Sequence, residues 1–386
     1  MLIINGTVHT MDSMTIPNGY VAVSGEKITA VGPMEEAPKE WEGELLDAKG
    51  GDILPGFIDA HCHLGMMEDG LGFEGNDGNE NTNPSTPQLR AVDSINPQDR
   101  CFEEAREGGV TTVITGPGSA NPIGGQLAAI KTAGRWVDEM VIRAPVAMKM
   151  AMGENPKKVY NSQHECPITR MATAFIIRDN LRRAQEYGEK LERAAADKKV
   201  AKPDYNAKME ALLPVVRGEL PVHFHAHRAD DIATAIRIAK EFHLKCVIVH
   251  CTEGHLIPEL LQKEGIPAIA GPILTDRSKP ELRNLTIEGP SILTLNGVQT
   301  AICTDHPVIP TQYLPLSATL AVRGGMQPEA ALAAITIIPA RICGIDDRVG
   351  SLTPGKDADI VVMSGHPINA LSRVLTVLIN GKKVKG

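Results

Sequence analysis

Short apolar runs recur along the middle of the chain, and stretches with helical periodicity lie between them. In RADDIATAIRIAKEFH, for example, apolar residues recur with a period near 3.6, and Asp230 or Asp231 can cap the first turn. Strand and helix alternate over about 300 residues, which predicts a parallel sheet, and an α/β fold of the (β/α)8 TIM-like barrel type fits that length. A doubly wound sheet is the alternative, but the Gly-x-Gly-x-x-Gly pattern after its first strand is missing. The strand candidates are VTTVITG, PVAMKMAMG, LPVHFHAH, CVIVHCTEG, IPAIAGPI and VQTAICTDH.

Both ends of the chain show a different pattern, in which short β-like runs are separated by turns. LIINGTVHTMD lies near the start, and VLTVLINGKKV, with an Asn-Gly hairpin signal, lies near the end. Neither end has enough strands to be stable alone, so we expect the two to pair into one small β-sandwich beside the barrel. The predicted organisation is a first sandwich part at 1–52, the barrel at 53–351 and a second sandwich part at 352–386.

Two segments interrupt the alternation. Residues 64–100 are rich in Gly, Asn, Asp and Pro and are too long for an ordinary connection, so they form either a floppy insertion or a cover over an active site. Residues 169–213 are strongly charged and have a helical pattern, which predicts a solvated insertion without a chemical role.

Composition narrows the choice of partners. Of the 386 residues, 42% are hydrophobic, the formal charge is -8 and only 3% are aromatic, which argues against a nucleic-acid-binding protein. No stretch has the ~18 apolar residues of a membrane span, and the first residues lack a signal-peptide pattern. The seven cysteines are scattered, as is typical of free thiols in a reducing compartment. We therefore expect a cytoplasmic protein with a small-molecule substrate; homo-oligomerisation is left open.

The chain's first candidate for chemistry is GFIDAHCHLG, where His61 and His63 lie one residue apart. Side chains alternate along a β-strand, so His61 and His63 project from the same face. Two imidazoles that point at one place can share a metal ion, or they can simply be polar residues at a strand end. This pair alone leaves both interpretations open.

Further histidines and one aspartate lie at the ends of other strand candidates. In a barrel these ends open on one face, where active sites form. Each buried imidazole needs a partner, so packing explains this many of them poorly, whereas a divalent metal can bind several at once. The residues concerned are His61, His63, His223, His225, His227, His250 and Asp305.

The motifs GFIDAHCHLG, AICTDH and SLTPGKDADIVVMS, with a histidine on each of two intervening strands, resemble the amidohydrolase superfamily of metal-dependent hydrolases. GPGSANPIGGQ and AMGENPK further resemble its imidazolonepropionase-like branch. The resemblance implies that His61, His63, His225 and His250 bind metal from the first, fifth and sixth strands. It also implies that Asp305, on the eighth strand, binds metal and accepts a proton from the attacking water. A carboxylate beside a metal-bound water of pKa near ~7 can do so at neutral pH.

Two further ligand assignments stay open. His223 and His227 share the face of His225, so which of the three binds metal depends on the strand register; His227 is also a candidate for substrate contact. Lys149 lies inside an apolar run, where an unpaired ammonium is costly. The resemblance implies either a carboxylated lysine bridging two metals or a strand-end glutamate, here Glu154, and a structural salt bridge of Lys149 is the third option.

Other residues are candidates for contact with substrate or for proton transfer. Asn121 and Gln126 in SANPIGGQ could hydrogen-bond a substrate amide, although a glycine-rich loop that merely turns is an equal alternative. His255 is another candidate for substrate contact. His250-Cys-Thr-Glu253 resembles the His-x-x-Glu of metal-dependent deaminases, in which the glutamate shuttles a proton, but it lies one strand later than in those enzymes.

The favoured hypothesis is a metal-dependent amidohydrolase in which metal-activated water cleaves a C–N bond of an amide, cyclic amide or peptide-like substrate. One alternative is a deaminase of an aminated heterocycle, and the other is a catalytically silent scaffold. The expected cofactor is one or two divalent ions, zinc first, with iron, manganese and nickel as alternatives.

Overall fold

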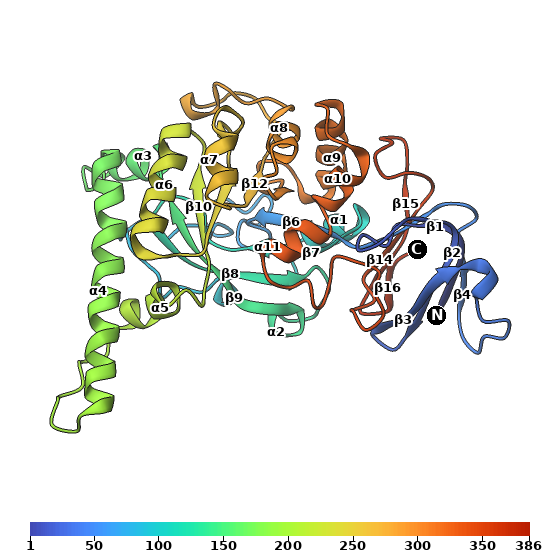
Figure 1. Ribbon diagram of the computed structural model, residues 1–386, viewed down its shortest axis with the longest axis horizontal. Helices are drawn as coiled ribbons and strands as arrows, with labels where there is room; N and C mark the ends of the chain where they lie inside the picture. The colour runs from blue at the N-terminus through green and yellow to red at the C-terminus, as the bar shows by residue number, and fades with distance from the viewer.

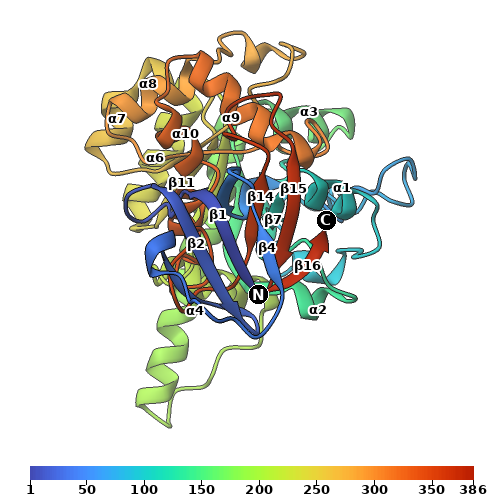
Figure 2. The same ribbon diagram turned by 90° about the vertical axis from the view of Figure 1, so that its right-hand side faces the viewer.

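The computed structural model describes residues 1–386 and contains two eight-stranded sheets at the centre and at one end of the molecule (Figure 1). The end sheet is built from both ends of the chain, as predicted, in the order β16-β15-β14-β5-β1-β2-β3, with β4 pairing β1 (Figure 2). Its apolar side chains, including Ile3, Val21 and Ile360, form a core of their own. Its strands are β1 (Leu2–Val8), β2 (Ile16–Ser24), β3 (Lys27–Pro33), β4 (Leu45–Asp47), β5 (Asp52–Pro55), β14 (Ile360–Met363), β15 (Val374–Ile379) and β16 (Lys382–Lys385).

The central sheet is a nearly closed barrel in which the strands follow one another in chain order, which confirms the predicted barrel class. Backbone N–H groups of Asp305 and His63 donate to the carbonyls of His61 and His306, and these bonds join the two edge strands. The strands are β6 (Phe57–Cys62), β7 (Val110–Thr115), β8 (Ile123–Lys131), β9 (Val141–Ala151), β10 (Val222–Ala226), β11 (Cys246–His250), β12 (Ala268–Ala270) and β13 (Thr300–Ile302).

The third barrel strand, β8, departs from the expected repeat because it runs antiparallel to both neighbours, β7 and β9. We predicted a parallel sheet and placed SANPIGGQ in a glycine-rich loop that either contacts substrate or merely turns, whereas Ile123–Lys131 forms a long strand. Two glycines weaken its strand signal, yet nearly all its residues are buried and its antiparallel pairing needs no crossover helix. The chain therefore reaches β9 through a short connection around α2 (Val137–Met140).

Helices pack around the remaining barrel strands, and the cluster between β9–β12 and α4–α6 is the largest apolar core. The first turn of α6 is capped from another segment: the backbone N–H of Ala229 donates to Glu253 Oε2 at 2.9 Å, while Asp231 pairs with Arg170 instead of capping. The helices are α1 (Cys101–Glu107), α3 (Glu154–Ser162), α4 (Arg170–Ala196), α5 (Ala207–Val216), α6 (Ala229–Phe242), α7 (Pro258–Lys263), α8 (Gly289–Leu295), α9 (Leu314–Arg323), α10 (Pro328–Ala333) and α11 (Ile337–Ile342), with 3-10 turns at Met34–Glu36, Ala91–Asp93, Gly254–Leu256, Pro280–Leu282 and Thr311–Tyr313.

The charged segment 169–213 is helical, as predicted, and projects from the barrel at the end opposite the terminal sheet (Figure 1). Thr169 caps α4 by accepting a hydrogen bond from the N–H of Ala172 at 3.1 Å. Ile177, Leu181 and Ala184 form the buried stripe of α4.

No helix of the structure has the length and apolar composition of a membrane span.

A buried ion cluster connects the barrel to the terminal sheet. Lys131, the last residue of β8, lies 3.0 Å from Asp357 and is also paired with Asp359, and all three side chains are at most 3% exposed. Arg348 and Lys27 bind the outer side of Asp357. Because the cluster joins β8 to the segment entering β14, it fixes the position of the terminal sheet.

Candidate metal centre

The candidate ligands are brought together by strand register at the carboxyl ends of the barrel strands. His225 on β10 is opposite Val249 on β11, and the next pair is Ala226 with His250. His250 and Asp305 have φ angles of 71° and 55°, in the left-handed region that non-glycine residues rarely adopt. Such backbone strain is common at functional sites, where the surrounding structure holds it in place.

The first cluster consists of His61, His63 and Asp305. Asp305 Oδ1 lies 3.6 Å from His61 Nε2 and 3.3 Å from His63 Nε2. His63 Nδ1 donates to the carbonyl of Gly116 at 2.7 Å, so its Nε2 carries the lone pair that faces the carboxylate. Burial would raise the pKa of Asp305, but the neighbouring His250 and His63 lower it to about 2. The carboxylate is therefore ionised at neutral pH.

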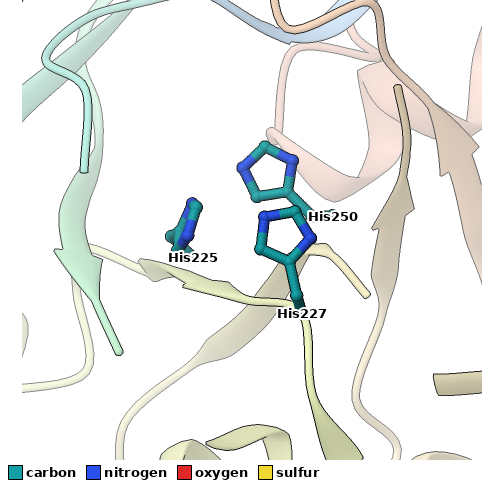
Figure 3. A group of neighbouring side chains, drawn as sticks. All are labelled: His225, His227 and His250. Carbon is teal, nitrogen blue, oxygen red and sulfur yellow. The ribbon is translucent and has the colours of Figure 1, made fainter. Parts of the chain in front are cut away.

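The second cluster consists of His225, His227 and His250 (Figure 3). The rings of His227 and His250 are stacked, with centroids 4.5 Å apart, and His225 lies edge-on to His250 with centroids 4.4 Å apart. Burial lowers the pKa of all three, so they are neutral imidazoles. His250 Nδ1 donates to the carbonyl of Gly271 at 2.8 Å, which leaves its Nε2 lone pair free.

The two clusters are neighbours, since the ring centroids of His61 and His250 are 5.5 Å apart. Lys149, on β9, is fully buried beside them, with Nζ 2.9 Å from His61 Nε2. Burial lowers the pKa of Lys149 to about 8. No carboxylate forms an ion pair with it, so the salt bridge that we weighed from the sequence is absent.

The structure does not bring Glu154 to either cluster. Its side chain makes no hydrogen bond or ion pair, and only its backbone N–H is engaged, donating to Glu281 Oε2 at 3.2 Å. His223 precedes His225 by two residues on β10 and pairs with Lys149 on β9. Neither of its ring nitrogens has a hydrogen-bond partner. Of the three histidines on or just after β10, the geometry therefore groups His225 and His227 with His250. The sequence had left the choice among the three open and had also made His227 a candidate for substrate contact.

Asn121 and Gln126, which the sequence offered as candidates for substrate contact, hydrogen-bond to the insertion 64–100 instead. Asn121 Nδ2 donates to the carbonyl of Glu80 and to Thr86 Oγ1, and its Oδ1 accepts from Tyr160. Gln126 Nε2 donates to the carbonyl of Pro87 at 3.1 Å. With these bonds the insertion is anchored along β8, and all the hydrogens of the Asn121 amide are used.

His255 and Glu253 are also engaged in bonds within the protein. His255 Nδ1 donates to the carbonyl of Thr252 at 2.9 Å, and its ring lies outside both clusters. Glu253 accepts from Asn284 Nδ2 at 2.8 Å in addition to the α6 N-terminus. Glu253 thus has a local structural role that the His-x-x-Glu motif does not reveal.

Four polar residues around the second cluster were not among the candidates that the sequence suggested. Glu281 Oε1 lies 3.5 Å from His227 Nε2 and 3.8 Å from His225 Nε2, and Lys279 Nζ lies 2.7 Å from the same oxygen. Asn155 Nδ2 lies 3.4 Å from His225 Nε2 and donates to Ser119 Oγ at 2.7 Å. Lys279 and Glu281 belong to a charged stretch without a motif, so the sequence alone carried no signal for them.

A pocket of about 620 Å³ lies between the insertion and the barrel mouth and includes Pro117 and Gly124 in its wall. Pro117 directly follows Gly116, whose carbonyl accepts the hydrogen bond from His63. A Cβ on Gly124 would lie 3.5 Å from Lys149 Cγ. The pocket therefore borders the first cluster. The rest of the wall comes from the insertion, mainly Asn76–Thr82 and Leu89–Ser94, and is mostly polar, with Met66 and Phe73 among its apolar members.

The donor set fits a divalent metal. Each cluster has three ligand atoms within 4.8 Å of one another, and nearly all are buried. His227 Nε2 has no hydrogen-bond partner, which is costly for a buried polar atom unless a cation binds it. Neutral imidazoles and a carboxylate are typical ligands of zinc and similar ions.

Comparison with known proteins agrees with this geometry. The model of the amidohydrolase family matches residues 53–384. The structure is similar to that of an amidohydrolase of Thermotoga maritima over 99% of both chains, with a TM-score of 0.95 and 44% identity. The curated amidohydrolase tasK of Hapsidospora irregularis is 31% identical over 94% of this chain, which spans only 39% of that relative. An imidazolonepropionase of Geobacillus kaustophilus is 26% identical over 90% of this chain and 84% of its own length. The chain therefore belongs to the amidohydrolase family, on its imidazolonepropionase-like branch, as its motifs predicted.

Proposed function

We propose that this protein is a hydrolase that uses two divalent metal ions to cleave the C–N bond of an amide, cyclic amide or peptide-like substrate. The observation that supports it is the pair of adjacent clusters, His61–His63–Asp305 and His225–His227–His250, each of which can hold one ion. Bound ions would supply Lewis-acid polarisation of the substrate carbonyl and activation of water.

Asp305 is the base in this proposal. Its carboxylate is ionised and lies at the mouth of the barrel, so Oδ2 can accept a proton from the attacking water and pass it to the leaving nitrogen. Its side chain is 17% exposed, unlike that of Lys149, so water can reach it.

Lys149, and not Glu154, is the residue that we propose between the two ions. Its Nζ reaches the first cluster, whereas the carboxylate of Glu154 makes no contact with either. Loss of one proton from the ammonium gives the neutral amine. Addition of carbon dioxide to that amine, with loss of a second proton, would give a carbamate anion that two ions can share. Without that change, the ammonium would repel metal ions bound next to it.

Elemental analysis of the purified protein tests the metal requirement, with zinc, manganese, iron and nickel each tried in reconstitution. The reaction class follows from a screen of N-acyl amino acids, dipeptides and cyclic amides, scored by release of an amine or carboxylate. Aminated heterocycles are included, with ammonia as the readout. Release of ammonia from a heterocycle and none from amides would replace the proposed reaction with deamination.

A further inference from the structure

We infer that Glu281 is a further protein ligand of the metal ion held by His225 and His227, and that Lys279 opposes that ion electrostatically. The inference rests on the proposed metal dependence of the second cluster. It concerns a carboxylate from the loop between β12 and α8, a segment that no motif of the chain marks as functional.

Two buried polar atoms, His227 Nε2 and Glu281 Oε1, face each other at this point. His227 Nδ1 is hydrogen-bonded to Thr252 Oγ1 at 2.8 Å, so its other nitrogen, Nε2, faces Glu281 Oε1. These two atoms are 3.5 Å apart and do not hydrogen-bond to each other. Both are buried without a hydrogen-bond partner, an arrangement that a cation between them would stabilise.

The distances match those between ligands of one ion. Ligand atoms at ~2.0–2.2 Å from a tetrahedral metal are about 3.3–3.6 Å apart. Glu281 Oε1 lies 3.5 Å from His227 Nε2 and 3.8 Å from His225 Nε2. The corresponding distances from Asp305 to His63 and His61 in the first cluster are 3.3 and 3.6 Å. Glu281 thus lies relative to His227 and His225 much as Asp305 lies relative to His63 and His61.

The surrounding backbone holds this carboxylate in place. Glu281 Oε2 accepts from the N–H of Glu154 at 3.2 Å, and the side chain of Glu281 is only 1% exposed. A Cβ on Gly153 would lie 3.0 Å from Oε2, and Gly153 has a φ of 81°, so both space and backbone favour glycine there. The other oxygen, Oε1, is the one directed at the histidines.

Lys279 is the only cation that contacts Oε1, with Nζ at 2.7 Å, although without hydrogen-bond geometry. Its side chain is 27% exposed, so it can leave for solvent when an ion binds. A divalent ion bound next to an ammonium is destabilised by charge repulsion. Removing Lys279 should therefore strengthen metal binding, and removing the carboxylate should weaken it.

The test measures metal content and the rate of zinc transfer to a chromogenic chelator in the reconstituted full-length protein. Glu281→Gln should release one of two ions ~10–100-fold faster, whereas Lys279→Gln should release the same ion more slowly. Glu154→Gln, the same change on a glutamate whose side chain makes no hydrogen bond or ion pair, is the matched control and should behave as wild type. His63→Ala identifies the ion of the first cluster, and the Cobalt(II) absorption spectrum of Glu281→Gln should change while that of Glu154→Gln does not.

The outcomes separate this inference from the proposed function. Wild-type protein with two ions and an unchanged release rate in Glu281→Gln would overturn the ligand role and leave the metal dependence intact. Equal acceleration in Glu281→Gln and Lys279→Gln would show that the two form a structural ion pair, which also overturns it. Wild-type protein that binds no ion after reconstitution would overturn both.

Discussion

Replacing Glu253 by Gln separates a structural role of this residue from a catalytic one. The carboxylate accepts two hydrogen bonds, from the α6 N-terminus at Ala229 and from Asn284 on the β12–α8 loop. Glutamine has only one acceptor oxygen, so its amide NH2 must face one of these two donors. We therefore expect Glu253→Gln to destabilise the fold while sparing the metal centre.

The size of the effect follows from these contacts. Losing one hydrogen bond to a buried charged group costs ~1.5–3 kcal/mol, and losing a negative charge at a helix N-terminus costs ~0.3–1 kcal/mol. The ion pair with Arg283 adds little, because it spans 3.5 Å and the arginine side chain is 68% exposed. The free energy of unfolding should fall by about 2–4 kcal/mol.

Urea unfolding followed by circular dichroism measures this change, with metal content determined on the same samples. Glu259→Gln is the control, because Glu259 is exposed in the first turn of α7 and makes no ion pair. It loses only the charge at a helix N-terminus, so its effect should stay within ~1 kcal/mol. A Glu253→Gln variant as stable as the control would refute the capping role. If that variant also lost ammonia-releasing activity, Glu253 would instead be the proton shuttle of a deaminase.

Other substitutions test the remaining parts of the molecule. His61→Ala and His63→Ala should each lose the ion of the first cluster with little change in circular dichroism, and a full complement of metal in both would contradict the ligand assignment. Asp305→Asn should lower kcat by ~100-fold or more with KM nearly unchanged once a substrate is known, because the amide cannot accept the proton; comparable kcat would place the base elsewhere. Lys131→Met should lower the free energy of unfolding by ~3–5 kcal/mol, since Asp357 and Asp359 lose their buried cation, and a neutral effect in urea unfolding would show that the ion cluster contributes nothing.

The barrel and most of the first cluster could be predicted because their signals are local. His61 and His63 share a strand face by the two-residue period, and Asp305 ends an apolar run, so strand patterning alone placed all three at one end of a barrel. The order of the apolar runs also predicted the positions of β7 and β9–β13. The family motifs then assigned roles to residues that patterning had only brought together.

The remaining features depend on contacts between distant segments. β8 has glycines and an antiparallel direction, so its strand character comes from pairing with β7 and β9 and not from its own sequence. Asn121 has the chemistry of a substrate-binding amide, but the insertion takes up its hydrogen bonds. Glu281 reaches the second cluster from a loop, and no periodicity specifies where a loop places its side chains.

The most direct test of the two-ion centre is a crystal structure of the zinc-reconstituted protein, with anomalous diffraction recorded on both sides of the zinc edge. Two anomalous peaks are expected, one among His61, His63 and Asp305 and one among His225, His227 and His250. Continuous density beyond Lys149 Nζ, of the size of a carboxylate, should lie between them. A single peak with an unmodified Lys149, or a peak bound by Glu154, would contradict the proposed centre.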